Sequence, residues 1–203
     1  MKKIKKLLKK KPVAIFLVVV LLLVFGWFVV TMVQNINEPS GNKVLIKTSM
    51  GDITVELNPD LAPVTVENFL AYVDSGYYDN LVFHRVIEGF MIQGGGFEKT
   101  GAQKETNKPI VLESNNGLHN NRYTIAMART VVPNSATSQF FINTRDNTPL
   151  DYSSSVNPGY AVFGIVVKGT DVVDKIEKVN TITKYGNADW PAEDAIIYSI
   201  DRV

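Results

Sequence analysis

The stretch FHRVIEGFMIQGGG, residues 83–96, places a cation, an amide and several large apolar side chains close together in the chain. Its β-branched and aromatic residues on both sides of a glycine predict two short strands joined by a turn. In that arrangement Phe90 and Met91 offer an apolar surface, while Arg85 and Gln93 can direct a hydrogen bond at a polar atom beside it. Such a surface suits a peptide that contains proline.

A second stretch, SQFFIN at residues 138–143, repeats this pairing of amide and aromatic side chains. Alternate residues of a strand lie on one face. Gln139 and Phe141 therefore share one face, and Phe140 and Ile142 share the other, which we expect to fill the core. Taken one at a time, such residues are commonly core filling, strand amides or partners in surface ion pairs. The hypothesis of a site depends on their joint occurrence.

The pattern of residues 43–203 predicts many short strands and two helices. The expected strands are Val44–Thr48, Ile53–Leu57, Phe83–Val86, Phe90–Gln93, Thr124–Ala128, Gln139–Asn143, Ala161–Val167 and Ile196–Ile200. Pro63 opens one helix, and the other is expected at 171–178, capped by Thr170 or Asp171. Short strands with few helices predict a closed β-barrel, although a β-sandwich fits the alternation nearly as well.

Charge is distributed unevenly along the 203 residues. Seven lysines and no acidic residue lie within 1–33, so that 34–203 carries 14 basic and 20 acidic side chains, a net charge of −6. We expect no nucleic-acid binding, because attraction to phosphates requires a basic face. The chain has no cysteine and only two histidines, His84 and His119. This composition excludes disulfides, thiolate catalysis and a histidine-rich metal centre.

The amino terminus predicts a membrane anchor. Residues 13–33 carry no charge, and as a helix they span roughly 30 Å, the thickness of the hydrocarbon layer. The basic segment 1–12 should stay cytoplasmic, which places the domain at 43–203 outside the cytoplasm behind a polar linker at 34–42. A cleaved signal peptide, leaving a secreted or periplasmic protein, is the alternative. It is disfavoured because no cleavage motif of small residues follows the apolar run.

Residues 43–203 resemble a single-domain bacterial cyclophilin, a peptidyl-prolyl cis-trans isomerase, from end to end. Besides the two stretches above, the resemblance rests on APVTVENF at 62–69, AVFG at 161–164 and EDA at 193–195. NGL at 116–118 together with TIAMAR at 124–129 is similar to the secreted bacterial members. The resemblance implies a closed eight-stranded antiparallel β-barrel capped by two helices. It also implies isomerisation of X-Pro bonds without a cofactor, a metal or a nucleophile.

By the same resemblance, Arg85 is the main catalytic residue. Rotation about the X-Pro bond is slow because amide resonance imposes a barrier of about 18–20 kcal/mol, and a donor beside the prolyl group favours the twisted state. The residues expected to bind substrate are Phe90, Met91, Gln93, Ala128, Arg129, Gln139, Phe141 and Leu150, with His84 and Tyr160 at the rim. The family often has histidine at the position of Tyr160.

One departure from the family bears on ligands. Pro149 stands where the family carries tryptophan or another aromatic residue, so we expect weak binding of cyclosporin. We expect a monomer whose partners are proline-containing polypeptides, exported or membrane-associated, whose folding it assists. Pro149 and Tyr160 also motivate an alternative, a module that binds proline-containing segments without turnover. A third hypothesis is a scaffold that only displays an acidic surface.

Overall fold

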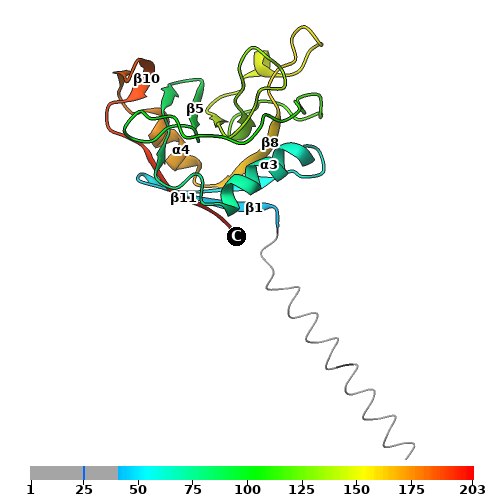
Figure 1. Ribbon diagram of the computed structural model, residues 1–203, viewed down its shortest axis with the longest axis horizontal. Helices are drawn as coiled ribbons and strands as arrows, with labels where there is room; N and C mark the ends of the chain where they lie inside the picture. Colours follow the sequence, from blue (N-terminus) through cyan, green and yellow to red (C-terminus); the bar gives the residue numbers. More distant parts are fainter. Residues whose placement is uncertain (1–24, 26–40) are drawn as a thin grey trace, which may run out of the picture. The chain divides into compact units, whose positions relative to one another are not determined.

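The computed structural model describes residue 25 and residues 41–203 (Figure 1). The predicted basic segment at 1–12, most of the predicted membrane helix at 13–33 and most of the linker at 34–42 lie outside the described residues. Within the described part of the chain, no helix combines the length and the apolar character needed to cross a membrane.

Nine strands form one antiparallel sheet. In spatial order these are β3 (Leu81–Val82), β11 (Ile196–Arg202), β1 (Lys43–Thr48), β2 (Gly51–Leu57), β8 (Val162–Lys168), β6 (Thr124–Met127), β7 (Phe140–Asn143), β5 (Met91–Gly94) and β4 (Arg85–Ile87). Seven of the predicted strands occur with ends shifted by one or two residues. Of the eighth, predicted at 83–86, only the second half is a strand, β4, because Phe83 and His84 lie between β3 and β4.

The sheet curls into a half-barrel and does not close, so the prediction of a closed eight-stranded barrel is wrong. Strands β3 and β4 end the sheet on its two sides, although only Phe83 and His84 separate them in the chain. The backbone N–H groups of Val82 and Phe83 donate to the carbonyls of Phe97 and Ala195, at 3.0 and 2.9 Å. The bond to Ala195 continues the pairing with β11, whereas the bond to Phe97 shows that a loop satisfies the free edge, and no ladder joins β3 to β4.

Two helices pack against the sheet, as predicted. The first, α3 (Pro63–Asp74), lies beside β11, and α4 (Thr170–Glu177) lies beside β2, β4 and β5 (Figure 1). Helix α4 does not begin at the predicted side-chain cap, because its N-cap is Gly169 with φ of 82° and no side-chain hydrogen bond. A Cβ at Gly169 would collide with the backbone of Asp52, so glycine is required where β8 turns into α4.

A hairpin absent from the predicted elements follows α4. Its strands β9 (Thr181–Lys184) and β10 (Asn187–Pro191) form a separate two-stranded sheet, and β10 lies against β4. Tyr185 and Gly186 form the turn with φ of 53° and 79°, the positive values that two-residue hairpin turns require. A short 3₁₀ helix, η1 (Thr148–Leu150), lies between β7 and β8 and precedes a loop that projects from the body (yellow in Figure 1).

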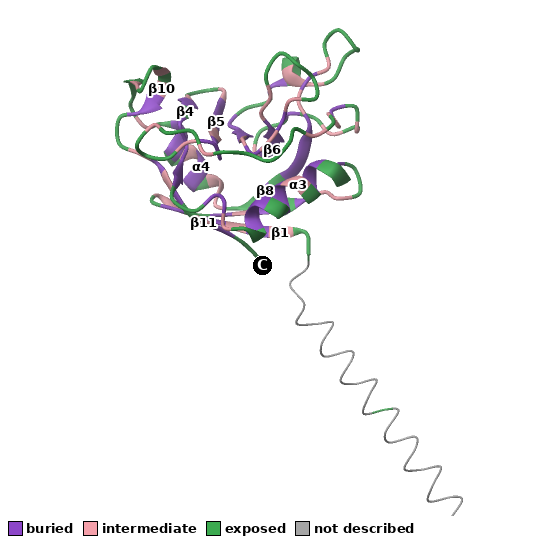
Figure 2. Ribbon diagram, in the orientation of Figure 1, coloured by how far each residue is buried: buried purple, intermediate pink, exposed green. Residues whose placement is uncertain are grey.

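Apolar side chains gather on both sides of the sheet, and Figure 2 shows burial concentrated in the strands rather than in the loops. The main core lies inside the curl and includes Phe69, Phe140 and Phe163. A smaller cluster on the other face consists of Met91, Ala126, Phe141 and Val162, partly covered by Ile87, Phe90, Leu118, Ala128, Leu150 and Tyr160. The sheet thus carries the main core on one face and a second, smaller apolar cluster on the other.

Candidate functional site

Strand register brings the predicted residues together. Directly opposite partners form a row across β4, β5, β7, β6 and β8, namely Arg85, Gln93, Phe141, Ala126 and Val162. Because paired residues point to the same face, these side chains lie on the outer face of the curl. Phe140 and Ile142 point into the main core, which confirms the predicted division of β7 into two faces.

Three residues of this row, Arg85, Gln93 and Phe141, line a hollow of about 120 Å³. Nine of the predicted site residues line it: Arg85, Phe90, Met91, Gln93, Ala128, Arg129, Phe141, Leu150 and Tyr160. The floor is apolar, since Met91 and Phe141 are 2% and 4% exposed. The hollow therefore combines an apolar floor with two guanidinium groups, those of Arg85 and Arg129, and one amide in its wall.

Gln139 does not line this hollow and lies next to it. The Nε2 of Gln93 donates to the Oε1 of Gln139 at 2.8 Å, so the two amides that the sequence singled out form a pair. Gln139 lines an adjoining groove of about 310 Å³ together with Gln93, Ala128 and Arg129. The amide pair thus separates the hollow from a polar groove along which an extended peptide can continue.

Tyr160 and Arg129 form one rim of the hollow. The ring of Tyr160 meets Phe141 edge-on at 5.6 Å between centroids, and the guanidinium of Arg129 lies over the same ring at 4.6 Å. The Nε of Arg129 also donates to the carbonyl of Gly159 at 2.8 Å. Stacking and hydrogen bonding hold Arg129 against the loop that follows η1, so its guanidinium is already occupied.

Buried amides support the opposite wall, and sequence reasoning did not select them. Asn147 donates from Nδ2 to the Phe90 carbonyl and to Oδ1 of Asn143, both at 2.8 Å. Asn120 donates to the Leu150 carbonyl at 3.1 Å. These side chains are at most 1% exposed, and buried amides that are fully paired rigidify what they hold. They hold the backbone at Phe90 and Leu150, two residues of the hollow.

His84 lies elsewhere than expected. It was predicted at the rim, but it is only 5% exposed and packs against Phe97 and Trp190 at 4.6 and 6.0 Å between ring centroids. Burial lowers the pKa of His84 to about 4, so the ring is neutral at physiological pH. Its Nδ1 has no hydrogen-bond partner among the described residues. Between β3 and β4, His84 turns towards the rings of Phe97 and Trp190, whereas Phe83 turns into the main core.

Arg85 has a charged neighbour that sequence reasoning did not find. The Oδ2 of Asp189 on β10 lies 3.7 Å from the Nε of Arg85, and the two side chains are 40% and 44% exposed. No local signal in the sequence joins these two distant positions. In the part of the chain that the structure describes, no group of three or more His, Cys, Asp or Glu side chains is placed to hold a metal ion.

The site offers an apolar pocket bordered by guanidinium and amide hydrogen-bond donors. Its lining residues include no acid–base pair of the kind found in a hydrolytic centre. An apolar ring can occupy the hollow while Arg85 donates to a polar atom at its edge. Such an arrangement favours a change of conformation in a bound chain by electrostatic stabilisation, without a covalent intermediate.

Known proteins are similar to this chain in sequence and in fold. The family model described as cyclophilin type peptidyl-prolyl cis-trans isomerase/CLD matches residues 43–202. A peptidyl-prolyl cis-trans isomerase of Streptomyces antibioticus is 54% identical over 158 residues, 77% of this chain and 95% of that protein. Peptidyl-prolyl cis-trans isomerase B of Escherichia coli is 54% identical over 159 residues, 77% of this chain and 97% of that protein.

A solved structure agrees with them. The crystal structure of a cyclophilin type peptidyl-prolyl cis-trans isomerase of Cryptosporidium parvum, determined in the presence of the dipeptide Ala-Pro, matches with a TM-score of 0.65. It is 29% identical and covers 79% of this chain and 98% of that one. The chain therefore belongs to the cyclophilin-type peptidyl-prolyl cis-trans isomerases, enzymes that interconvert the cis and trans forms of X-Pro bonds.

Proposed function

We propose that the hollow is a proline pocket and that Arg85 catalyses the isomerisation. The observation that carries this proposal is the hollow itself, in which the guanidinium borders an apolar volume of about 120 Å³. An apolar cavity of about 150 Å³ accommodates benzene, so the smaller volume suits a five-membered ring. The Cryptosporidium parvum structure obtained in the presence of Ala-Pro supports a proline-containing ligand.

In the proposed reaction, the proline ring enters between Phe90, Met91 and Phe141, and its amide lies beside Arg85. The guanidinium donates a hydrogen bond that strengthens as resonance is lost and the amide twists. Uncatalysed exchange takes tens to hundreds of seconds, and reaching milliseconds requires roughly 10⁵-fold acceleration, about 7 kcal/mol. Preorganised donors in a partly dry site act on this scale together with the restraint of the bound peptide.

The neighbouring amides would bind the peptide backbone. Because Gln93 donates to Gln139, its own Oε1 remains an acceptor that can receive a peptide N–H or the Arg85 guanidinium. Ala128 and Arg129 line both the hollow and the adjoining groove, and the peptide would run past them. His84 receives no role in binding in this proposal, because its side chain is buried among aromatic rings.

Isomerase kinetics on an X-Pro peptide test the catalytic role of Arg85. We expect Arg85→Ala to lower kcat/KM roughly 100-fold or more, the scale seen when one preorganised donor is removed. The matched control is Arg122→Ala, since Arg122 is 49% exposed and pairs with Asp174 at 3.0 Å. Wild-type kinetics in Arg85→Ala would refute the role of Arg85. Peptide binding by the wild type without faster exchange in NMR would favour the non-catalytic binding module.

We also propose that the enzyme acts outside the cytoplasm on exported or membrane-associated proteins, tethered by residues 13–33. The support is the uncharged run behind seven lysines, with release after signal cleavage as the alternative. Weak cyclosporin binding stays a prediction, argued from Pro149 in η1 beside the lining residue Leu150. A monomeric state likewise stays a prediction.

A further inference from the structure

We propose that Asp189 is a positioning residue for the isomerase reaction, which holds the guanidinium of Arg85 at the edge of the proline pocket. The inference rests on the catalytic role proposed above for Arg85 and adds a residue from a separate hairpin to that machinery. It concerns orientation of Arg85 and assigns Asp189 no contact with the substrate.

The geometry of the pair leaves the two Nη atoms of Arg85 available to the substrate. Asp189 approaches Arg85 at Nε, with Oδ2 at 3.7 Å. A guanidinium carries five N–H donors, so a carboxylate at Nε leaves donors on both Nη atoms for the substrate. Arg85 also lines a second hollow of about 440 Å³, shared with Asp189, His84 and Phe97. The guanidinium thus stands between the proline pocket and a hollow whose wall holds its counterion.

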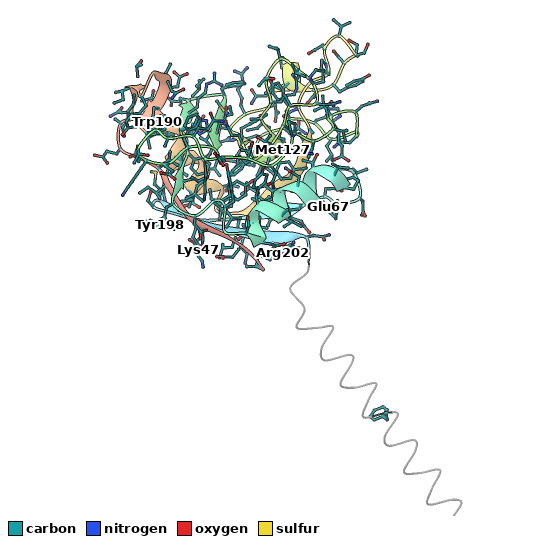
Figure 3. All side chains as sticks on the ribbon, viewed as in Figure 1. Lys47, Glu67, Met127, Trp190, Tyr198 and Arg202 are labelled. Carbon is teal, nitrogen blue, oxygen red and sulfur yellow. The ribbon has the colours of Figure 1, made fainter. Side chains whose placement is uncertain are left out.

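The hairpin that carries Asp189 is firmly anchored. Trp190, the next residue, is fully buried and is marked on the hairpin in Figure 3. Its Nε1 donates to Oδ1 of Asp194 at 2.9 Å, and Lys184 donates to the same oxygen at 2.8 Å. The indole also meets the rings of Phe97 and Tyr185 edge-on at 5.9 and 5.3 Å. Asp189 is therefore held by a rigid element and not by a mobile loop tip.

The backbone conformation at Asp189 supports a positioning role for this residue. Its φ is 59°, in the left-handed region, and the register of β10 against β9 shifts between Asn187 and Trp190. Bulges re-aim side chains and occur next to active sites, and strained residues cluster at functional sites. Aspartate and asparagine tolerate left-handed φ better than most residues, which makes Asp189→Asn a conservative test.

The other charged side chains near this pair do not compete with Arg85 for the Asp189 carboxylate. Among the described residues, Arg85 is the cation that lies within 4.0 Å of the Asp189 carboxylate. Lys184, on the facing strand, is engaged by Asp194. His84, which lines the same hollow, is kept neutral by burial, with a pKa of about 4. The attraction therefore acts on one guanidinium without competition from a neighbouring cation.

A pair this exposed adds little to the stability of the fold, so its effect belongs to catalysis. An unpaired arginine side chain samples many rotamers, and restricting them in advance lowers the cost of reaching the transition state. Because the proposed hydrogen bond of Arg85 is realised in the twisted amide, better positioning should raise kcat and leave KM unchanged.

The test is Asp189→Asn in the detergent-purified full chain, assayed by peptide exchange NMR. We expect kcat to fall about 3-fold to 10-fold, with KM and Tm unchanged and with a shifted Nε–H resonance of Arg85. In an Arg85→Lys background, which lacks that Nε–H, Asp189→Asn should cause no further loss. The matched control, Asp174→Asn, removes the carboxylate that pairs with Arg122 and should leave kcat at the wild-type value.

The outcomes separate this inference from the proposal on which it rests. Wild-type kcat in Asp189→Asn, or an equal loss in the wild-type and Arg85→Lys backgrounds, overturns the role of Asp189. An unchanged Arg85 Nε–H resonance also overturns it. Full activity in Arg85→Ala would instead refute the catalytic role of Arg85. If Arg85→Ala is inactive while Asp189→Asn behaves as the wild type, the proposed function stands and only the positioning role fails.

Discussion

His84 and Arg85 are neighbours in the chain and have opposite environments. Arg85 borders the hollow, whereas His84 lies under Phe97 and Trp190. Burial lowers the pKa of His84 in the folded protein from 6.5 to about 4. Between pH 6.5 and pH 4 the unfolded chain therefore binds this proton and the folded protein does not. Stability from this residue is present above pH 6.5 and is lost as the pH falls towards 4.

This difference predicts a pH dependence that a single replacement removes. Between pH 7 and pH 4, the free energy of unfolding of the wild type should fall by about 3 kcal/mol more than that of His84→Phe. Urea titrations at a series of pH values measure the difference, and the Cε1–H resonance of His84 should titrate with a midpoint near 4. Parallel pH profiles of the two proteins, or a midpoint near 6.5, would contradict the prediction.

The predictability of single residues depended on how far their partners lie in the chain. Met91 and Gln93 were predictable, because strand alternation puts them on one face within a short segment, and the family resemblance supplied Phe90, Leu150 and Tyr160. The position of His84 was not predictable, because its face depends on where β3 ends and β4 begins. Asp189 was not predictable either, because its approach to Arg85 requires the hairpin to fold against β4.

At the scale of elements, two adjacent phenylalanines of β7 are expected to have different roles, one in stability and the other in substrate binding. Phe140 belongs to the main core and Phe141 to the outer apolar cluster. Phe140→Leu should lower the free energy of unfolding by roughly 1–2 kcal/mol, part of the 3–5 kcal/mol expected for truncation to alanine, with kcat/KM per folded molecule unchanged. Phe141→Leu should lower kcat/KM roughly 10-fold, equivalent to about 1.4 kcal/mol, with a smaller loss of stability.

Denaturant unfolding and peptide kinetics on both variants check this division. Each variant serves as the control of the other, since the change of side chain is identical and the two positions are adjacent on one strand. An equal loss of activity in the two variants would show that the outer face of β7 has no special part in binding.

Periodicity predicted most strands, but it missed β3, β9 and β10. Hydrophobic alternation identifies strands whose one face is buried, which holds for β1 and β2. Strand β9 has no buried residue, so its sequence carries no such alternation and the hairpin was missed. Closure of the sheet was predicted wrongly because alternation reports which face is buried. It does not report whether the two end strands form hydrogen bonds with each other.

At the scale of the whole molecule, two of the relatives consist almost entirely of the domain. The Streptomyces antibioticus and Escherichia coli isomerases align over 95% and 97% of their own lengths but over 77% of this chain. The family match begins at residue 43. The domain is therefore sufficient for the family fold, and residues 1–42 have to be explained by a different requirement, such as placing the enzyme.

The uncharged run at 13–33 predicts that the full chain is an integral membrane protein. Twenty-one residues without a charge span the hydrocarbon layer as a helix, so high salt should not extract the full chain from membranes, whereas detergent should. Residues 43–203 alone should stay soluble with the same kcat/KM on a short peptide, because the hollow is built within that range. As a matched variant, Leu22→Asp with Leu23→Asp should abolish the membrane association. Membrane fractionation with amino-terminal sequencing of the mature protein decides between anchor and leader: a soluble protein whose sequence begins after residue 33 would contradict the anchor, since a cleaved leader leaves the domain without a tether.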